Sequence, residues 1–225
     1  MMIKQIRTIG LTAILFSLVG CVIAPATPKD ISIYKANMPK SILVLPPIND
    51  TPDVKASYSY WPTVMQPVAE AGYYVFPLSV VDTMFKENGI TNANDAQNIA
   101  PEKLKEIFGA DSALYIRIKQ YGSKYQVLQT TVSVAVDAKL VDLKTGQTLW
   151  TGEKELIQAN NNSNNGIAGI LVGALVDQIV NNLSDKAYPL SGMVSQQLLT
   201  PTQAPGVGLL YGPRSPKFQQ DGIVK

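Results

Sequence analysis

In the first half of the chain, short apolar runs alternate with helical patterns. The continuous apolar run over residues 41–47, closed by two prolines, predicts a buried, central and parallel strand. A second strand is expected over residues 73–76. Apolar residues spaced three and four apart predict helices that end at Gly72, Gly89 and Gly109, because glycine suits a left-handed helix end. This order of elements predicts an α/β fold.

After residue 113 the pattern changes to alternation. Residues 114–118 alternate apolar and polar, and residues 128–140 place apolar side chains at even positions and polar ones at odd positions. A hairpin turn is expected at residues 142–146, followed by a return strand over residues 148–156. We therefore expect a single α/β domain with a mixed sheet, which ends in an antiparallel hairpin with one buried and one polar face.

Residues 158–188 combine a polar, asparagine-rich loop with a glycine-rich helix that is apolar on nearly all sides. Such a helix needs cover on more than one side. The spacing of Gly169 and Gly173 allows close helix approach, which predicts self-association as a homodimer; packing of these residues within one chain is the alternative. Beyond this C-terminal helical segment, the Pro- and Gly-rich tail over residues 200–225 is expected to be irregular, either a strap over the domain or disordered.

The N-terminus has the layout of a secretory signal peptide over residues 1–20. Lys4 and Arg7 precede an apolar run that is shorter than the ~20 residues of a membrane-spanning helix. The Leu-Val-Gly-Cys motif that ends at Cys21 resembles the lipobox of bacterial lipoproteins. The resemblance implies that Cys21 is lipidated and becomes the mature N-terminus. It also implies sorting to the outer membrane, because Val22 stands where an aspartate favours inner-membrane retention.

Residues 21–40 are expected to hold the lipidated cysteine and a tether, because prolines and small residues dominate the start of this segment. At ~3.3 Å per residue, residues 22–30 span about 30 Å when fully extended. The α/β domain is then expected over residues 41–199, close to the bilayer and facing the periplasm.

Composition narrows the possible functions. The 19 basic and 17 acidic residues become 17 and 17 once a signal peptide carrying Lys4 and Arg7 is removed, so the mature net charge is zero. A neutral chain argues against nucleic-acid binding, which needs a basic face. The chain has no histidine, and its one cysteine is Cys21. Metal sites built on His or Cys and His-dependent nucleophile systems are excluded, and we expect no metal, no cofactor and no enzymatic activity.

Four segments carry a resemblance to a known family. They are "SILVLPP", "EAGYYVFPLSVVDTMFKENGI", "LKEIFGADSALYIRI" and "VDAKLVDLKTGQTLWTGE". Their order resembles that in a family of bacterial lipoproteins of unknown function, the GNA-type antigen lipoproteins. The layout is also similar to the CsgG-type lipoprotein of curli secretion channels and to the N-terminal domain of TolB. The resemblance covers roughly residues 41–155 and implies one α/β domain, but its motifs carry no catalytic role. Residues 58–62 and the segment after Gln158 depart from the pattern.

Two pairs of carboxylates are candidate acid–base or ligand sites. Asp50 and Asp53 follow the first strand, where α/β folds often bind ligands; the alternative is that they form turns. Glu153 and Glu155 share one face of the return strand, and the alternative there is a solvated edge. A hydrolase that uses such carboxylates is the third functional hypothesis, behind the two that follow.

The densest aromatic cluster, Tyr58, Tyr60 and Trp61, is a candidate partner-binding patch, because exposed aromatic residues anchor interfaces; core packing is the alternative. We expect a non-enzymatic, lipid-anchored protein that acts as an assembly or accessory subunit of an outer-membrane or transport/secretion complex and contacts other envelope proteins. The alternative is a periplasmic auxiliary lipoprotein that binds a small ligand through residues 49–53.

Overall fold

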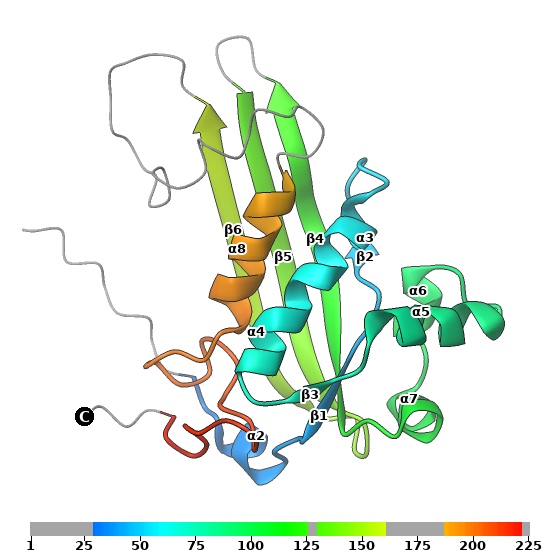
Figure 1. The fold of residues 1–225 in the computed structure, drawn as a ribbon, viewed down its shortest axis with the longest axis vertical. Helices are drawn as coiled ribbons and strands as arrows, with labels where there is room; N and C mark the ends of the chain where they lie inside the picture. Colours follow the sequence, from blue (N-terminus) through cyan, green and yellow to red (C-terminus); the bar gives the residue numbers. More distant parts are fainter. Residues whose placement is uncertain (1–28, 126–129, 161–186, 222–225) are drawn as a thin grey trace, which may run out of the picture.

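The computed structural model describes residues 29–125, 130–160 and 187–221, and a six-stranded mixed sheet lies at its centre (Figure 1). The strands are β1 (Ser41–Val44), β2 (Ile48–Asn49), β3 (Tyr74–Val75), β4 (Ser112–Tyr125), β5 (Thr130–Asp142) and β6 (Thr148–Asn160). Their order across the sheet is β3-β1-β4-β5-β6, and β2 also pairs with β4. The predicted α/β fold with a mixed sheet is therefore confirmed.

The parallel half of the sheet consists of β3, β1, β2 and the start of β4. β1 pairs in parallel with β3 on one side and with β4 on the other, which confirms the prediction made from its continuous apolar run. Ile42, Leu43 and Val44 are all fully buried. Consecutive side chains of a strand point to opposite faces, so three consecutive buried residues need cover on both faces of the sheet, and the helices supply it.

Two groups of helices connect the parallel strands. The first group is α3 (Ala56–Tyr60), the 3₁₀ helix η1 (Trp61–Val64) and α4 (Met65–Glu70), and the second is α5 (Leu78–Glu87), α6 (Ala93–Gln97) and α7 (Pro101–Phe108). Because β3 and β4 lie on opposite sides of β1, right-handed crossovers place the two groups on opposite faces of the sheet. Gly109 ends α7 with a left-handed φ of 68°, as predicted.

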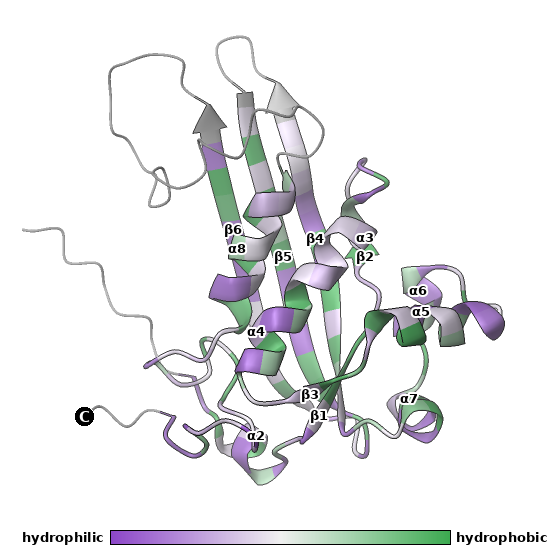
Figure 2. Cartoon of the chain, viewed as in Figure 1, coloured by the Kyte–Doolittle hydropathy of each residue, from purple (hydrophilic) through white to green (hydrophobic). Residues whose placement is uncertain are grey.

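The antiparallel half consists of β5, β6 and the rest of β4. One of its faces is covered by α8 (Ala187–Leu199), which lies beside α3 and α4 (Figure 1). Alternating hydrophobic and hydrophilic bands run along these strands in Figure 2. The even-numbered apolar residues of β5 are buried, as predicted: Val132, Val134, Val136, Ala138 and Leu140. The alternation fails at Ser133, which is also buried, and its hydroxyl donates to Gln120 Oε1 at 3.1 Å.

The segment before β1 differs from the expected tether. Residues in it form α2 (Ser32–Ala36), and the Tyr34 side chain is only 1% exposed. The Tyr34 hydroxyl lies 2.9 Å from that of Tyr73, which donates to the Leu210 carbonyl at 2.7 Å. Because Tyr34 packs into the core, the folded domain already includes residues from Lys29 onward, ahead of the boundary expected at residue 41.

The described part of the C-terminal tail, residues 200–221, is a strap over the domain, one of the two expected states. Its backbone bonds to the N-terminal segment, where the Lys29 N–H donates to the Pro205 carbonyl at 3.0 Å. It also bonds to the end of α4, where the Gly212 N–H donates to the Ala71 carbonyl at 2.8 Å. The tail thus joins two segments that are far apart in sequence.

Several predicted features lie outside the described residues: the signal peptide, Cys21, and the glycine-rich helix with Gly169 and Gly173. In the portions of the chain that are described, no helix combines the length and apolar character needed to cross a bilayer.

Candidate functional site

The structure separates the members of the aromatic cluster. Tyr60 is fully buried and Trp61 is 4% exposed, and the Trp61 indole N–H donates to the Val44 carbonyl at 3.2 Å. Burial raises the pKa of the Tyr60 hydroxyl well above its usual value. These two residues are therefore core residues and not the exposed patch that the sequence suggested. Tyr58 is 58% exposed and is the member of the cluster that a partner can contact.

Tyr58 borders a groove of about 200 Å³ between α3, α5 and α6. The groove is lined both by apolar side chains, among them Pro46, Val54, Trp61, Phe85, Ile90 and Ala96, and by the polar or charged Ser57, Asp82, Lys86, Thr91 and Asn92. The Tyr58 ring packs edge-on to the Trp61 ring, with 6.4 Å between the centroids. The buried Trp61 ring thus packs against the exposed Tyr58 ring.

A charged pair forms the rim of this groove. Lys86 Nζ lies 2.6 Å from Asp82 Oδ2 and 5.5 Å from the centroid of the Tyr58 ring. The hydrogen bond to Asp82 raises the pKa of the Lys86 ammonium, which stays charged at neutral pH. A groove that combines apolar side chains, an exposed aromatic ring and a charged pair has the mixed composition of a small protein–protein contact.

The loop that carries Asp50 and Asp53 uses its polar groups internally. Asn49 Oδ1 accepts from the Thr51 N–H at 2.9 Å, and Asp53 Oδ1 accepts from the Lys55 N–H at 2.9 Å. Asp50 forms a two-oxygen ion pair with Arg117 Nη1, at 2.9 Å to each oxygen. The two carboxylates thus do not converge on a common site, and the turn-forming alternative describes this loop.

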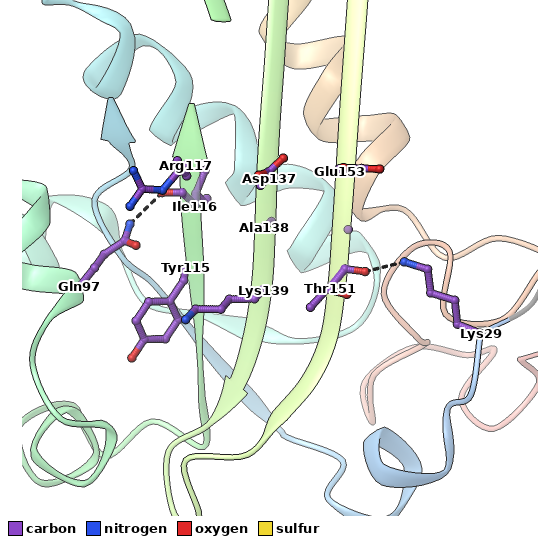
Figure 3. Close-up of a pocket in the computed structure, with 11 residues that line it drawn as sticks. Lys29, Gln97, Tyr115, Ile116, Arg117, Asp137, Ala138, Lys139, Thr151 and Glu153 are labelled. Carbon is purple, nitrogen blue, oxygen red and sulfur yellow. Dashed lines mark hydrogen bonds between the residues drawn. The ribbon is translucent and has the colours of Figure 1, made fainter. Parts of the chain in front are cut away.

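A second, polar cavity of about 550 Å³ lies on the face of β4, β5 and β6 that α8 does not cover (Figure 3). It is lined by side chains from facing positions of the three strands, and the charged ones are Arg117, Asp137, Lys139 and Glu153, with Lys29 from the N-terminal segment. The alternation of apolar and polar residues over residues 128–140 predicted that the sheet has such a polar face.

Most charges at this cavity are matched by a neighbour. Lys139 Nζ lies 4.8 Å from the centroid of the Tyr115 ring, and Lys119 forms an ion pair with Asp137. Burial, and secondarily the charge of Glu102, raises the pKa of the Tyr115 hydroxyl. Among the residues described, no group of three or more acidic side chains is arranged to hold a metal ion. Most charged side chains on this face are therefore paired, and the Glu153 carboxylate lies on its outer strand, β6.

Comparison with known proteins defines the class of protein first. The profile of the GNA1162-like lipoprotein family matches residues 29–214, and the chain belongs to this family. It is therefore a lipoprotein of the cell envelope, and the family resemblance inferred from the four sequence segments is confirmed.

Particular relatives follow from the same comparison. The chain is 43% identical over 206 residues to "Putative lipoprotein NMB1124/NMB1162" of Neisseria meningitidis serogroup B, covering 92% of this chain and 94% of the relative. It is similar to the crystal structure of lipoprotein GNA1162 from Neisseria meningitidis, with 47% identity, a TM-score of 0.54, and coverage of 64% of this chain and 100% of that chain. A more distant likeness is to the PelC dodecamer from Paraburkholderia phytofirmans, with 12% identity, a TM-score of 0.42, and coverage of 76% and 89% of the two chains.

Proposed function

We propose that this lipoprotein is a non-enzymatic assembly or accessory subunit of an outer-membrane or transport complex, and that it binds a partner protein through the groove beside Tyr58. The observation that carries the proposal is the exposed Tyr58 ring, which packs against the buried Trp61 at the edge of a groove lined by apolar and polar side chains. A rigid, supported aromatic side chain next to a pocket is the typical arrangement of an interface hot spot. The lipid on Cys21 would hold the domain at the periplasmic face of the outer membrane.

The size of the groove favours a protein partner over a small molecule. Small-molecule sites are typically about 300–1,000 Å³, whereas the groove measures about 200 Å³. It suits one apolar side chain of a partner, with Tyr58 and Val54 beside that side chain and the Lys86–Asp82 pair at the rim.

The ligand-binding alternative is less well supported. The polar groups of the loop over residues 49–53 form hydrogen bonds within turns and the ion pair between Asp50 and Arg117. The cavity on the open sheet face has a suitable volume, but charged side chains line it, whereas small-molecule sites are predominantly apolar.

Site-specific crosslinking in intact cells tests the proposal. A photo-crosslinking amino acid at position 58 should give one dominant adduct with an envelope protein. The same amino acid in place of Ile107, an exposed apolar residue on α7, is the matched control and should not give that adduct. Equal adducts at both positions, or none at position 58, would remove Tyr58 from the interface.

Self-association stays a separate proposal, because Gly169 and Gly173 lie outside the described residues. The competing account is that the tail, through Leu209 and Leu210, covers that helix within one chain; the described hydrogen bonds of these two residues are with Leu199 and Tyr73. Light scattering on the lipid-free domain separates the two. A dimer weakened by Gly173→Leu supports self-association, and a strict monomer at high concentration contradicts it.

A further inference from the structure

The outer edge of β6 is an unpaired strand edge within the described structure. β5 is the only described strand that pairs with β6, and the register between them is regular from Thr151 to Asn160. At the start of this edge, Lys29 Nζ donates to the Thr151 carbonyl at 2.8 Å, so this carbonyl points away from β5 (Figure 3). Because backbone groups alternate along a strand, those of Glu153, Glu155 and Ile157 point outward as well.

These outward backbone groups have no backbone partner among the residues described. The side chains of the same three residues are exposed, Ile157 by 54%. Exposed strand edges are templates for pairing with another chain, and proteins commonly cover or charge them. Here the N-terminal segment covers the edge up to Thr151, and no described residue pairs with the stretch over residues 152–158.

The charges along this stretch indicate what kind of chain it accepts. In the described structure, neither Glu153 nor Glu155 has a basic side chain within ion-pair distance; the nearby Lys119 pairs with Asp137 instead. Both carboxylates share the open face of the sheet, and Ile157 follows on the same face. An added strand would therefore place two side chains beside carboxylates and a third beside an isoleucine.

A second copy of the chain fits this edge poorly. The antiparallel register that pairs the whole open stretch with itself is centred on Glu155 and brings the two Glu155 carboxylates opposite each other. Like charges directly opposite one another destabilise a strand pair, whereas opposite charges stabilise it. The complementary occupant is thus a segment of a different protein that carries basic residues.

We propose that the edge of β6 over residues 152–158 binds an extended segment of a partner protein as an added strand. The segment carries two basic residues two positions apart, beside Glu153 and Glu155, and an apolar residue beside Ile157. Backbone hydrogen bonds hold such a strand and the alternate side chains select it. The inference rests on the proposed function in that the partner is an envelope protein, but the edge and the Tyr58 groove are separate surfaces.

Peptide binding to the full chain in detergent tests the proposal. The probe is the symmetric peptide Thr-Val-Thr-Lys-Thr-Lys-Thr-Val-Thr, which presents the same pattern in either direction, and its matched control has Glu for Lys. We expect the Lys peptide to bind about tenfold more tightly than the Glu peptide, since each exchange replaces an attraction with a repulsion. It should also slow amide hydrogen exchange over residues 152–158. Equal affinities, or slowed exchange elsewhere on the sheet, would overturn the proposal.

Three variants make the test specific. Glu155→Pro removes an outward N–H, which an edge strand tolerates, and should abolish the binding. Should this variant fold poorly, the double variant Glu153→Lys with Glu155→Lys keeps the strand intact and should reverse the order of the two peptides. Lys154→Gln, on the α8 face, is the control and should change the affinity less than twofold. Tyr58→Ala should leave peptide binding unchanged, so that failure of this proposal is distinguishable from failure of the groove.

Discussion

The two halves of the sheet differ in how they are covered. In the parallel half, helices cross both faces, and β1 buries Ile42, Leu43 and Val44 completely. In the antiparallel half, α8 covers one face and the other carries Asp137 and Lys139. The sequence reflects this difference, because β1 is a continuous apolar run whereas β5 alternates. The comparison teaches that β1 contributes to the core through both of its faces, whereas the antiparallel strands contribute through the face under α8 and, within the described residues, leave their other face available for contacts.

The largest expected effect contrasts one residue from each half. Leu43→Ala removes a fully buried side chain from β1 and should lower the free energy of unfolding by about 2–5 kcal/mol. Lys139→Ala, on the open face of β5, should change it by about 0.5 kcal/mol or less, since surface changes are usually this small. Denaturant unfolding of both variants measures the difference. Similar losses of unfolding free energy in the two variants would show that Lys139, on the open face, stabilises the fold as much as the buried Leu43 does.

A smaller effect tests the attachment of the tail to the parallel half. Gly72 has a φ of 99°, and a Cβ there would lie 2.4 Å from the Ser215 backbone nitrogen. Gly89 has a φ of 77° with no atom within 4 Å of its Cβ position. Gly89→Ala should therefore cost about 1–2 kcal/mol of unfolding free energy, the cost of the left-handed backbone alone.

Gly72→Ala should cost clearly more than Gly89→Ala, because the tail must also move. Thermal unfolding of the two variants, side by side, checks this. Equal losses would mean that the strap at Ser215 adds little to the stability of the parallel half.

The smallest effect concerns pH and the same strap. Asp221 is 8% exposed, and its Oδ1 accepts from the Tyr211 N–H at 3.0 Å. Burial raises the pKa of this carboxyl, although the Tyr211 N–H and the charge of Lys35 oppose the shift. The folded state thus binds the proton more tightly than the unfolded chain does. The contribution of Asp221 to stability is present below the unfolded pKa of about 3.9 and is lost as the pH rises through the raised folded pKa.

Asp221→Asn is neutral at every pH and should flatten this part of the stability profile. The change in slope should stay below about 1.4 kcal/mol per pH unit, the limit for one proton. Unfolding free energies measured across the acid range, for the parent and the variant, give the slopes. Parallel profiles would show that Asp221 titrates normally in the folded protein.

Local patterns predicted much of this fold. The helix ends at Gly89 and Gly109 and the parallel β1 follow from residues that are close in sequence. Helix α8 was not predicted, although Leu190, Val194 and Leu198 have helical spacing, because the buried residues between them include Ser191 and Ser195. These serines are satisfied locally or across the fold: Ser191 donates to the Ala187 carbonyl at 2.8 Å, and Ser195 contacts Thr63 at 2.6 Å.

The features that sequence reasoning missed depend on distant partners. Trp61 is buried because its indole reaches the Val44 carbonyl, and Tyr34 is buried because Tyr73 and Leu210 close over it. No local pattern distinguishes an exposed aromatic residue from a buried one in so short a cluster. The groove beside Tyr58 therefore became visible only when α3, α5 and α6 were placed together.

Amide hydrogen exchange of the lipidated protein, measured in outer-membrane preparations and again in detergent after purification, tests the central claim most directly. If the protein is a binding subunit that uses its open surfaces, exchange over residues 54–58 and 152–158 should be slower in the membranes. Exchange over β1 should be equally slow in both samples, because the core does not change. Identical exchange at both open segments in the two samples would contradict the account.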